Sequence, residues 1–366
     1  MARKLKPDKL LFLATFLLLC CSVVMVYSAS AAVAMDRYQQ PYFFLFKQIT
    51  WTVLGFCLLA GAMRVDYRRL KQPVVFWTVL GVSTAALVAV FFSPKVNGAQ
   101  RWLGVAGVGV QPSELAKLAV IIFTAAVLER RMARIDEVSH SLLPIAVVTG
   151  GISWLIYAEP DYGTALMVLL IVGAMVFTAG LSYRHLFAAG LVAVPLLYVI
   201  LASADYRYRR LVAFLNPWDD PLDAGFQVIQ SLIAVGTGGV FGRGLMGGVQ
   251  KLFYLPAPHT DFIYAVIAEE TGLIGATVIL ACFCVITWRG LRVTALAPDR
   301  FGAFLAIGLT TMVALQAFLN VSVTLGLMPT TGIPLPFVSA GGSSLLINLL
   351  GMGILLNISQ HASAEA

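Results

Sequence analysis

Three carboxylates stand at the start of one long apolar segment and inside it. Asp261 follows a polar loop that contains two prolines, and Glu269 and Glu270 come eight and nine residues further along. At ~1.5 Å per helical residue, the two glutamates lie roughly 12 Å deeper in the segment than Asp261. A carboxylate at the surface end can take a proton from an attacking hydroxyl group. The alternative is that Asp261 only caps the helix, beside the positive end of its dipole.

A second group of charged residues lies before another apolar segment, 112–129, and in its first turns. Glu114 and Lys117 are three residues apart, so they lie on the same face of a helix. One interpretation is a local ion pair that makes two charges tolerable within a membrane. The other is that Lys117 and Arg101 face a cavity and hold an anionic ligand, with Trp102 as a rigid apolar wall.

Two further turns between apolar segments contain polar residues. The first, at 159–163, is acidic, and its Asp161 either caps the next helix or joins Glu159 on the rim of a site. Small residues accompany Ser339 and Ser343 in the last turn. They permit either close helix packing or close approach of a ligand to the backbone, and the sequence does not separate these two.

Membrane-spanning segments must position these residues. Hydrophobic residues make up 59% of the 366 residues and charged residues 12%, which is far from the balance of a soluble domain. The apolar runs are long enough to cross a hydrocarbon core of about 30 Å. The sequence therefore predicts an all-α polytopic membrane protein, one domain over residues 1–366, with about ten spans. These spans are 10–33, 42–63, 73–92, 112–129, 141–158, 162–181, 184–203, 261–288, 301–326 and 335–358.

Lys and Arg residues predict the orientation. In the short loops they concentrate on the side that holds both termini, which places the termini in the cytoplasm by the positive-inside rule. The long segment 204–260, with Arg243 and Lys251, is then an extracytoplasmic loop between spans seven and eight. It is either a passive cover over the helix ends or a lid above a cavity. Topology explains the net charge of +7, so nucleic acid is not an expected partner.

Other classes of site have little support. The five cysteines fall in apolar spans, where they behave as small hydrophobes, and the four histidines lack zinc-ligand spacing. No Walker A motif is present, and the G-x-G-x-x-G match at 242–247 has no strand before it, so a flexible turn is expected. Energy must therefore come from the substrate itself or from an ion gradient.

Several motifs, in this order and over nearly the whole chain, resemble the SEDS family (shape, elongation, division and sporulation). They are Asn97-Gly-Ala-Gln-Arg-Trp102, Gln111-Pro-Ser-Glu-Leu-Ala-Lys117, Glu159-Pro-Asp-Tyr-Gly163, Gln230-Ser-Leu-Ile-Ala234, Tyr254-Leu-Pro-Ala-Pro-His-Thr-Asp261, Glu269-Glu-Thr-Gly272 and Pro334-Leu-Pro-Phe-Val-Ser339. The resemblance implies a bacterial inner-membrane glycosyltransferase that polymerises lipid II into the growing glycan strand of peptidoglycan, with an active site that faces outward. It also implies a class B penicillin-binding protein (a transpeptidase) and divisome proteins as partners.

The resemblance also implies roles for the polar residues. Asp261 would be the general base for a GlcNAc 4-hydroxyl that attacks the anomeric carbon of a MurNAc linked to lipid pyrophosphate. Cationic side chains would stabilise the leaving pyrophosphate, and a divalent cation there is the candidate cofactor. The substrate-binding candidates are Arg101, Trp102, Glu114, Lys117, Arg243, Lys251, His259, Ser339 and Ser343, and the supporting candidates are Glu159, Asp161, Glu269 and Glu270.

Three alternatives remain open at this level. Residues 26–30 and 326–332 resemble the division-type member of the family more than the elongation type, so an elongation polymerase is the first alternative. Interrupted spans and intramembrane carboxylates also fit a lipid II flippase, and a catalytically silent scaffold is the third. Glycan synthesis in detergent separates polymerase from flippase, because no bilayer sidedness exists there.

Overall fold

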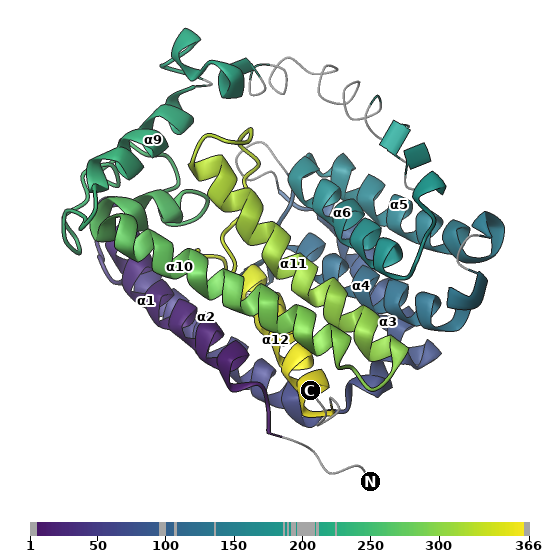
Figure 1. Ribbon diagram of the computed structural model, residues 1–366. Coiled ribbons are helices and arrows are strands. Elements are labelled where there is room, and N and C mark those ends of the chain that lie inside the picture. Colours follow the sequence, from purple (N-terminus) through teal and green to yellow (C-terminus); the bar gives the residue numbers. More distant parts are fainter. Residues whose placement is uncertain are drawn as a thin grey trace.

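The computed structural model of the chain describes residues 6–94, 100–105, 108–134, 137–185 and 225–361, with 187–188, 190–191, 195, 209 and 212–223. These residues form a bundle of long helices and one small antiparallel hairpin (Figure 1). The α-helices are α1 (Lys9–Tyr38), α2 (Phe43–Arg64), α3 (Pro73–Val90), α4 (Pro112–Arg131), α5 (Leu143–Ala158), α6 (Tyr162–Thr178), α9 (Phe226–Gly238), α10 (Ile263–Ala295), α11 (Arg300–Thr324) and α12 (Gly342–His361). The short helical turns are η1 (Tyr67–Lys71), η2 (Met132–Arg134), η3 (Val138–Leu142) and η4 (Pro217–Asp219), and the strands are β1 (Leu103–Val105) and β2 (Val108–Val110).

Seven helices of the described chain are long and apolar enough to cross a membrane. They are α1, α2, α3, α10, α11, α12 and the continuous helix His140–Ala158, which comprises the end of η3 and all of α5. The chain is a helical multi-pass membrane protein, as its composition predicts. Helix α4 has 20 residues but contains the charged residues Glu114, Lys117 and Glu129, and α6 has 17 residues. The expected seventh span, 184–203, lies mostly outside the described residues, so the count of ten spans stays a prediction.

Helices α11 and α12 form the centre of the bundle. In their most apolar windows, 72% and 78% of the residues are buried, against 17% in α2. Figure 1 shows α1, α2 and α10 on one side of this centre and α3, α4, α5 and α6 on the other. The large apolar side chains exposed on the outer helices suit lipid, which is as apolar as leucine. Polar side chains on α11 and α12 therefore meet protein.

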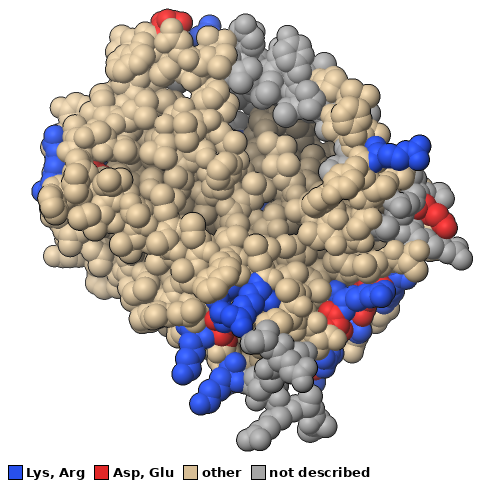
Figure 2. Space-filling view, viewed as in Figure 1, with Lys and Arg blue, Asp and Glu red and all other residues tan. Residues whose placement is uncertain are grey.

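The charged side chains are distributed unevenly over the surface. Figure 2 shows Lys and Arg gathered along the lower edge, where Figure 1 places both termini, while most of this face is uncharged. The positive-inside rule predicts that this edge faces the cytoplasm.

The last span begins later than expected. The sequence predicted a span from 335, but α12 begins at Gly342, because Pro334 and Pro336 prevent a regular helix there. The preceding segment is non-helical and buried, and Ser22 Oγ donates a hydrogen bond to Val338 O at 2.9 Å. Irregular backbone at membrane depth is tolerated where protein surrounds it.

Helix α10 is interrupted at Gly272, where the sequence suggested a continuous helix. Gly272 has φ +68°, and a Cβ atom there would lie 2.4 Å from both Gly242 N and Val240 O. Residues 239–244 lie alongside the interruption, where Leu273 N donates to Gly239 O at 2.9 Å. Only glycine combines this backbone conformation with so close an approach.

Candidate functional site

Asp261 lies in a pocket of about 100 Å³, two residues before α10 begins. The residue at the N-cap position is Phe262, whose side chain makes no capping hydrogen bond. Asp261 therefore precedes the N-cap position of α10 and does not occupy it. The pocket is lined by Gln227, Asp261, Phe262, Asn320, Val323, Thr330, Thr331, Gly332 and Ile333.

The backbone that leads into Asp261 is held by hydrogen bonds at consecutive carbonyl groups. His259 O accepts from Ala340 N at 2.9 Å, and Thr260 O accepts from Ser339 Oγ at 2.6 Å. The hydroxyl of Ser339 also accepts from Leu335 N at 2.8 Å. Ser339, a candidate substrate ligand in the sequence, thus donates its only proton to the backbone beside Asp261.

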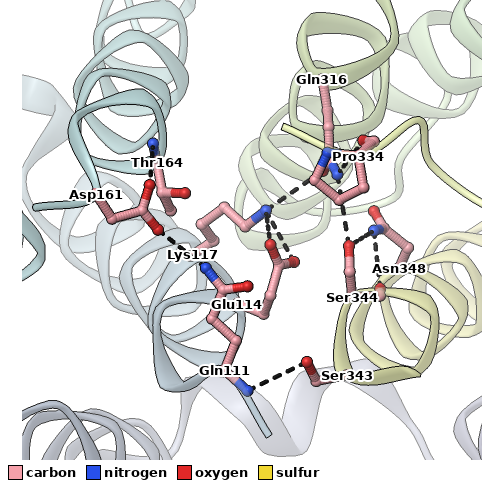
Figure 3. A network of polar contacts seen from close by, with 10 residues as sticks. All are labelled: Gln111, Glu114, Lys117, Asp161, Thr164, Gln316, Pro334, Ser343, Ser344 and Asn348. Carbon is pink, nitrogen blue, oxygen red and sulfur yellow. Dashed lines mark hydrogen bonds and ion pairs between the residues drawn. The ribbon is translucent and has the colours of Figure 1, made fainter. Parts of the chain in front are cut away.

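The Glu114–Lys117 ion pair predicted from the sequence is present. Lys117 Nζ lies 2.9 Å from both carboxylate oxygens of Glu114, and both residues are 2% exposed. Figure 3 shows the network around this pair, in which Lys117 Nζ also lies 3.3 Å from Gln316 Oε1. Gln316 Nε2 donates to Pro334 O at 2.9 Å. The pair is thereby connected to the segment that lines the Asp261 pocket.

Gln111 joins three parts of the chain at the start of α4 (Figure 3). Its backbone N donates to Ser343 Oγ on α12 at 3.2 Å, and its side-chain Nε2 donates to Asp161 Oδ2 at 2.9 Å. Asp161 also accepts from Thr164 N at 3.3 Å, so it caps α6 as its position in the turn predicted. Ser343 and Asp161 therefore hold the β2–α4 connection against α12 and α6.

The hairpin places Arg101 against the α5–α6 turn. Arg101 donates to Glu159 O at 3.3 Å and to Pro160 O. Across the hairpin, a Cβ atom at Gly109 would lie 3.3 Å from the indole of Trp102. The motif residues 97–99, which precede Arg101, lie outside the described residues.

Glu159 is fully buried, and neither carboxylate oxygen has a hydrogen-bond partner in the described part of the chain. Burial, reinforced by the negative charge of Asp161, raises the pKa of Glu159 to about 8, against an opposing effect of Arg101. The carboxyl group is therefore largely protonated at neutral pH, which makes its burial tolerable.

Glu269 and Glu270 belong to a separate cluster. Lys251 Nζ lies 2.5 Å from Glu270 Oε1 and donates to Ser28 Oγ on α1 at 2.8 Å. Glu269 Oε1 accepts from Val249 N at 2.8 Å. These contacts hold the segment before α10 against the helix at its interruption.

The cationic side chains predicted to stabilise the pyrophosphate are not among the residues that line the Asp261 pocket, and their role toward the substrate stays a prediction. Lys251 does not line the Asp261 pocket, and its charge is paired with Glu270 in a buried contact. Arg243 lies 3.9 Å from Glu269 and its side chain is 40% exposed. His259 lies against the ring of Phe44, 4.8 Å between centroids, and burial lowers its pKa to about 4, so it is neutral at pH 7.

Two buried amides of α11 were missed from the sequence. Gln316 and Asn320 are 0% and 1% exposed, and Asn320 Nδ2 donates to Asp261 O and to Ile333 O, both at 2.8 Å. The available signal was two amide side chains four residues apart in an apolar span, which places them on one helix face.

The side chains of the described residues offer no evident metal site. Among these residues no group of three or more His, Cys, Asp or Glu side chains comes together in a way that could hold a metal ion. The divalent cation expected at the pyrophosphate stays a prediction.

The chain is similar to proteins of known family over nearly its whole length. A family model described as a cell cycle protein, covering FtsW, RodA and SpoVE, matches residues 8–364. A probable peptidoglycan glycosyltransferase FtsW of Geobacter sulfurreducens is 43% identical over 356 residues, which are 96% of this chain and 95% of that protein. The stage V sporulation protein E of Bacillus subtilis is 40% identical over 370 residues, 98% of this chain and 99% of that protein.

Solved structures show the same fold. A chain from work on the structural coordination of polymerization and crosslinking by a peptidoglycan synthase complex aligns with a TM-score of 0.80 and 30% identity, over 98% of this chain and 99% of that one. The rod shape determining protein RodA of Thermus thermophilus aligns with a TM-score of 0.72 and 28% identity, over 98% of both chains.

Proposed function

The chain belongs to the cell cycle protein family that contains FtsW, RodA and SpoVE, and we propose that it is a peptidoglycan glycosyltransferase of cell division with Asp261 as its general base. The family membership predicted from the sequence motifs is confirmed by the match over residues 8–364. The names of the FtsW relatives, at 43% identity over nearly the full length, support both the activity and the division role.

The placement of Asp261 carries the proposal. The carboxylate lies in a pocket just before the first residue of α10. The backbone at Gly332 passes close to it, since a Cβ atom at Gly332 would lie 3.7 Å from Asp261 Oδ2. A hydroxyl group is a weak nucleophile at neutral pH, so a positioned carboxylate that takes its proton accelerates attack. The pocket of about 100 Å³ admits the reacting atoms, and the rest of a lipid-linked sugar must lie outside it.

The reaction then proceeds in one displacement. The 4-hydroxyl of the acceptor GlcNAc loses its proton to Asp261 as its oxygen bonds to the anomeric carbon of the donor MurNAc. The bond from that carbon to the pyrophosphate oxygen breaks, and the pyrophosphate leaves with the electron pair. A single displacement inverts the anomeric centre, so an α-linked donor yields a β-linked glycan.

Arg101 is the cation that we assign to the leaving pyrophosphate. It binds the α5–α6 turn, and the first turn of α6, which follows directly, reaches the pocket-lining segment, since a Cβ atom at Gly163 would lie 3.1 Å from Thr331 O. Preorganised cations stabilise charge that develops in the transition state. Lys117 is buried against Glu114, so its proposed role is to hold the Pro334 segment through Gln316.

A class B penicillin-binding protein is the proposed partner. The structural neighbour from a peptidoglycan synthase complex, in which polymerization and crosslinking are coordinated, supports this assignment. Crosslinking of peptides needs a transpeptidase, which the partner supplies. Lipid II, the growing glycan strand and the divisome proteins complete the proposed set, and the active site is proposed to face outward.

Purified protein with lipid II in detergent, with and without the partner, tests the function. We expect glycan strands from the wild type and at least a 100-fold lower rate from Asp261→Asn, because general-base catalysis contributes ~10²–10⁴-fold. Asp223→Asn is the matched control, since the side chain of Asp223 is 76% exposed, and it should retain the wild-type rate. Normal synthesis by Asp261→Asn would remove Asp261 from the mechanism. Movement of lipid II across liposomes without any glycan in detergent would instead favour the flippase.

A further inference from the structure

Asn320 joins two of the segments that line the pocket. Its Nδ2 donates to Asp261 O and to Ile333 O, both at 2.8 Å, from a position on α11 that is 1% exposed. Both partners are carbonyl oxygens, which only accept hydrogen bonds, so the donor end of the amide must face them. One side chain thus connects the chain before α10 to the chain before α12.

We propose that Asn320 is a positioning residue of the glycosyltransferase, which fixes the Asp261 carboxylate relative to the segment 330–333. This inference rests on the proposed function of Asp261 as general base. An aspartate has a short side chain, so its carboxylate moves whenever its backbone moves. Together with the bonds from Ser339 Oγ to Thr260 O and from Ala340 N to His259 O, Asn320 completes a run of three consecutive carbonyl groups that are held in place.

Stability alone does not explain an amide at this position. Asn320 Oδ1 is buried and has no hydrogen-bond partner among the described residues, and a buried acceptor without a partner costs free energy. One turn earlier, Gln316 Nε2 already donates to Pro334 O at 2.9 Å, so α11 holds the 333–334 chain independently. Compared with Gln316, Asn320 adds a contact to the backbone of Asp261.

The expected consequence is a loss of turnover with little loss of substrate binding. A displacement of ~1 Å in a reacting group lowers a rate by on the order of 100-fold. Asn320→Leu keeps the branched shape and the number of side-chain heavy atoms and removes both N–H donors. We expect kcat for lipid II polymerisation to fall at least tenfold and KM to stay within twofold, because Asn320 is only 1% exposed and its amide donates to backbone carbonyls.

Asn357→Leu is the matched control. Asn357 is also fully buried and also bridges two backbone segments, with Nδ2 donating to Met63 O at 2.7 Å and Oδ1 accepting from Tyr67 N at 3.1 Å. These contacts lie at the other end of α12, so this variant should lose thermal stability with kcat within twofold of the wild type.

Hydrogen exchange gives a readout that does not depend on activity. In the full-length protein, Asn320→Leu should raise amide exchange in peptides that cover 257–263 and 330–334, and Asn357→Leu should not. If Asn320→Leu does not fold, Asn320→Ser tests the positioning role instead. Its single hydroxyl donor can hold only one of the two carbonyl groups, so kcat should fall several-fold.

The possible results separate the two claims. Wild-type kcat in Asn320→Leu or in a folded Asn320→Ser would overturn the positioning role, as would equal losses of kcat in Asn320→Leu and Asn357→Leu. If Asp261→Asn is inactive while Asn320→Leu is fully active, only the positioning role fails. If Asp261→Asn is fully active, the base assignment fails, and the positioning role fails with it.

Discussion

Replacement of Lys117 by methionine strands a carboxylate inside the bundle. Lys117 Nζ lies 2.9 Å from both oxygens of Glu114, and the two side chains are 1% and 3% exposed. Methionine preserves most of the side-chain volume and removes the charge. Glu114 then has no cation beside it among the described residues, and Gln316 Oε1 loses its contact with the ammonium group.

The magnitude follows from burial. Breaking a buried ion pair by removing one partner costs about 3–5 kcal/mol, whereas replacing both charges by neutral groups of similar volume is often nearly neutral. We therefore expect Lys117→Met to lower the free energy of unfolding by about 3–5 kcal/mol. The double variant Glu114→Gln with Lys117→Met should recover most of that loss.

A denaturant titration in detergent measures the free energy of unfolding of the wild type, of Lys117→Met, of Glu114→Gln and of the double variant. The rate of glycan synthesis is measured on the same samples. Activity should recover less than stability in the double variant, because Gln316 Oε1 still lacks the Lys117 ammonium group that helps to orient its amide toward Pro334 O. The reverse swap, Glu114→Lys with Lys117→Glu, should show the same difference.

Equal losses of unfolding free energy in Lys117→Met and in the double variant would refute the reasoning, because no stranded charge would then be present. Full activity in the double or swapped variant would leave the pair with a structural role alone.

Three further predictions concern the other buried groups. Folding raises the pKa of Glu159 from 4.5 to about 8, so the folded state binds the proton more tightly and stability falls as pH rises from about 4.5 to about 8; Glu159→Gln should flatten this part of a plot of melting temperature against pH. Gly272→Ala should abolish stable folding in a thermal assay, because its Cβ would lie 2.4 Å from backbone atoms at φ +68°. Gly81→Ala in α3, with nothing within 4 Å of the added atom, should be neutral. Lys251→Met should cost about 3–5 kcal/mol of unfolding free energy, since it leaves Glu270 buried without its cation, and Glu270→Gln in the same chain should restore most of it.

Local features of the site were predictable from the sequence. The Glu114–Lys117 contact follows from a spacing of three residues on a helix, and the capping of α6 by Asp161 follows from its place in a turn. Both depend on neighbours in the chain. The membrane class follows from composition alone, because a bilayer demands long apolar helices.

The tertiary structure decided which charged residues share a site. Lys251 and Asp261 are close in the sequence, yet Lys251 pairs with Glu270 while Asp261 lines a pocket that Lys251 does not line. Asn320 meets Asp261 across 59 residues of chain. Lipid supplies no hydrophobic drive between helices, so packing and polar contacts set their arrangement. Such contacts depend on the close approach of segments far apart in the chain, at Gly272 and at Gly332, and the period of a single apolar span carries no information about them.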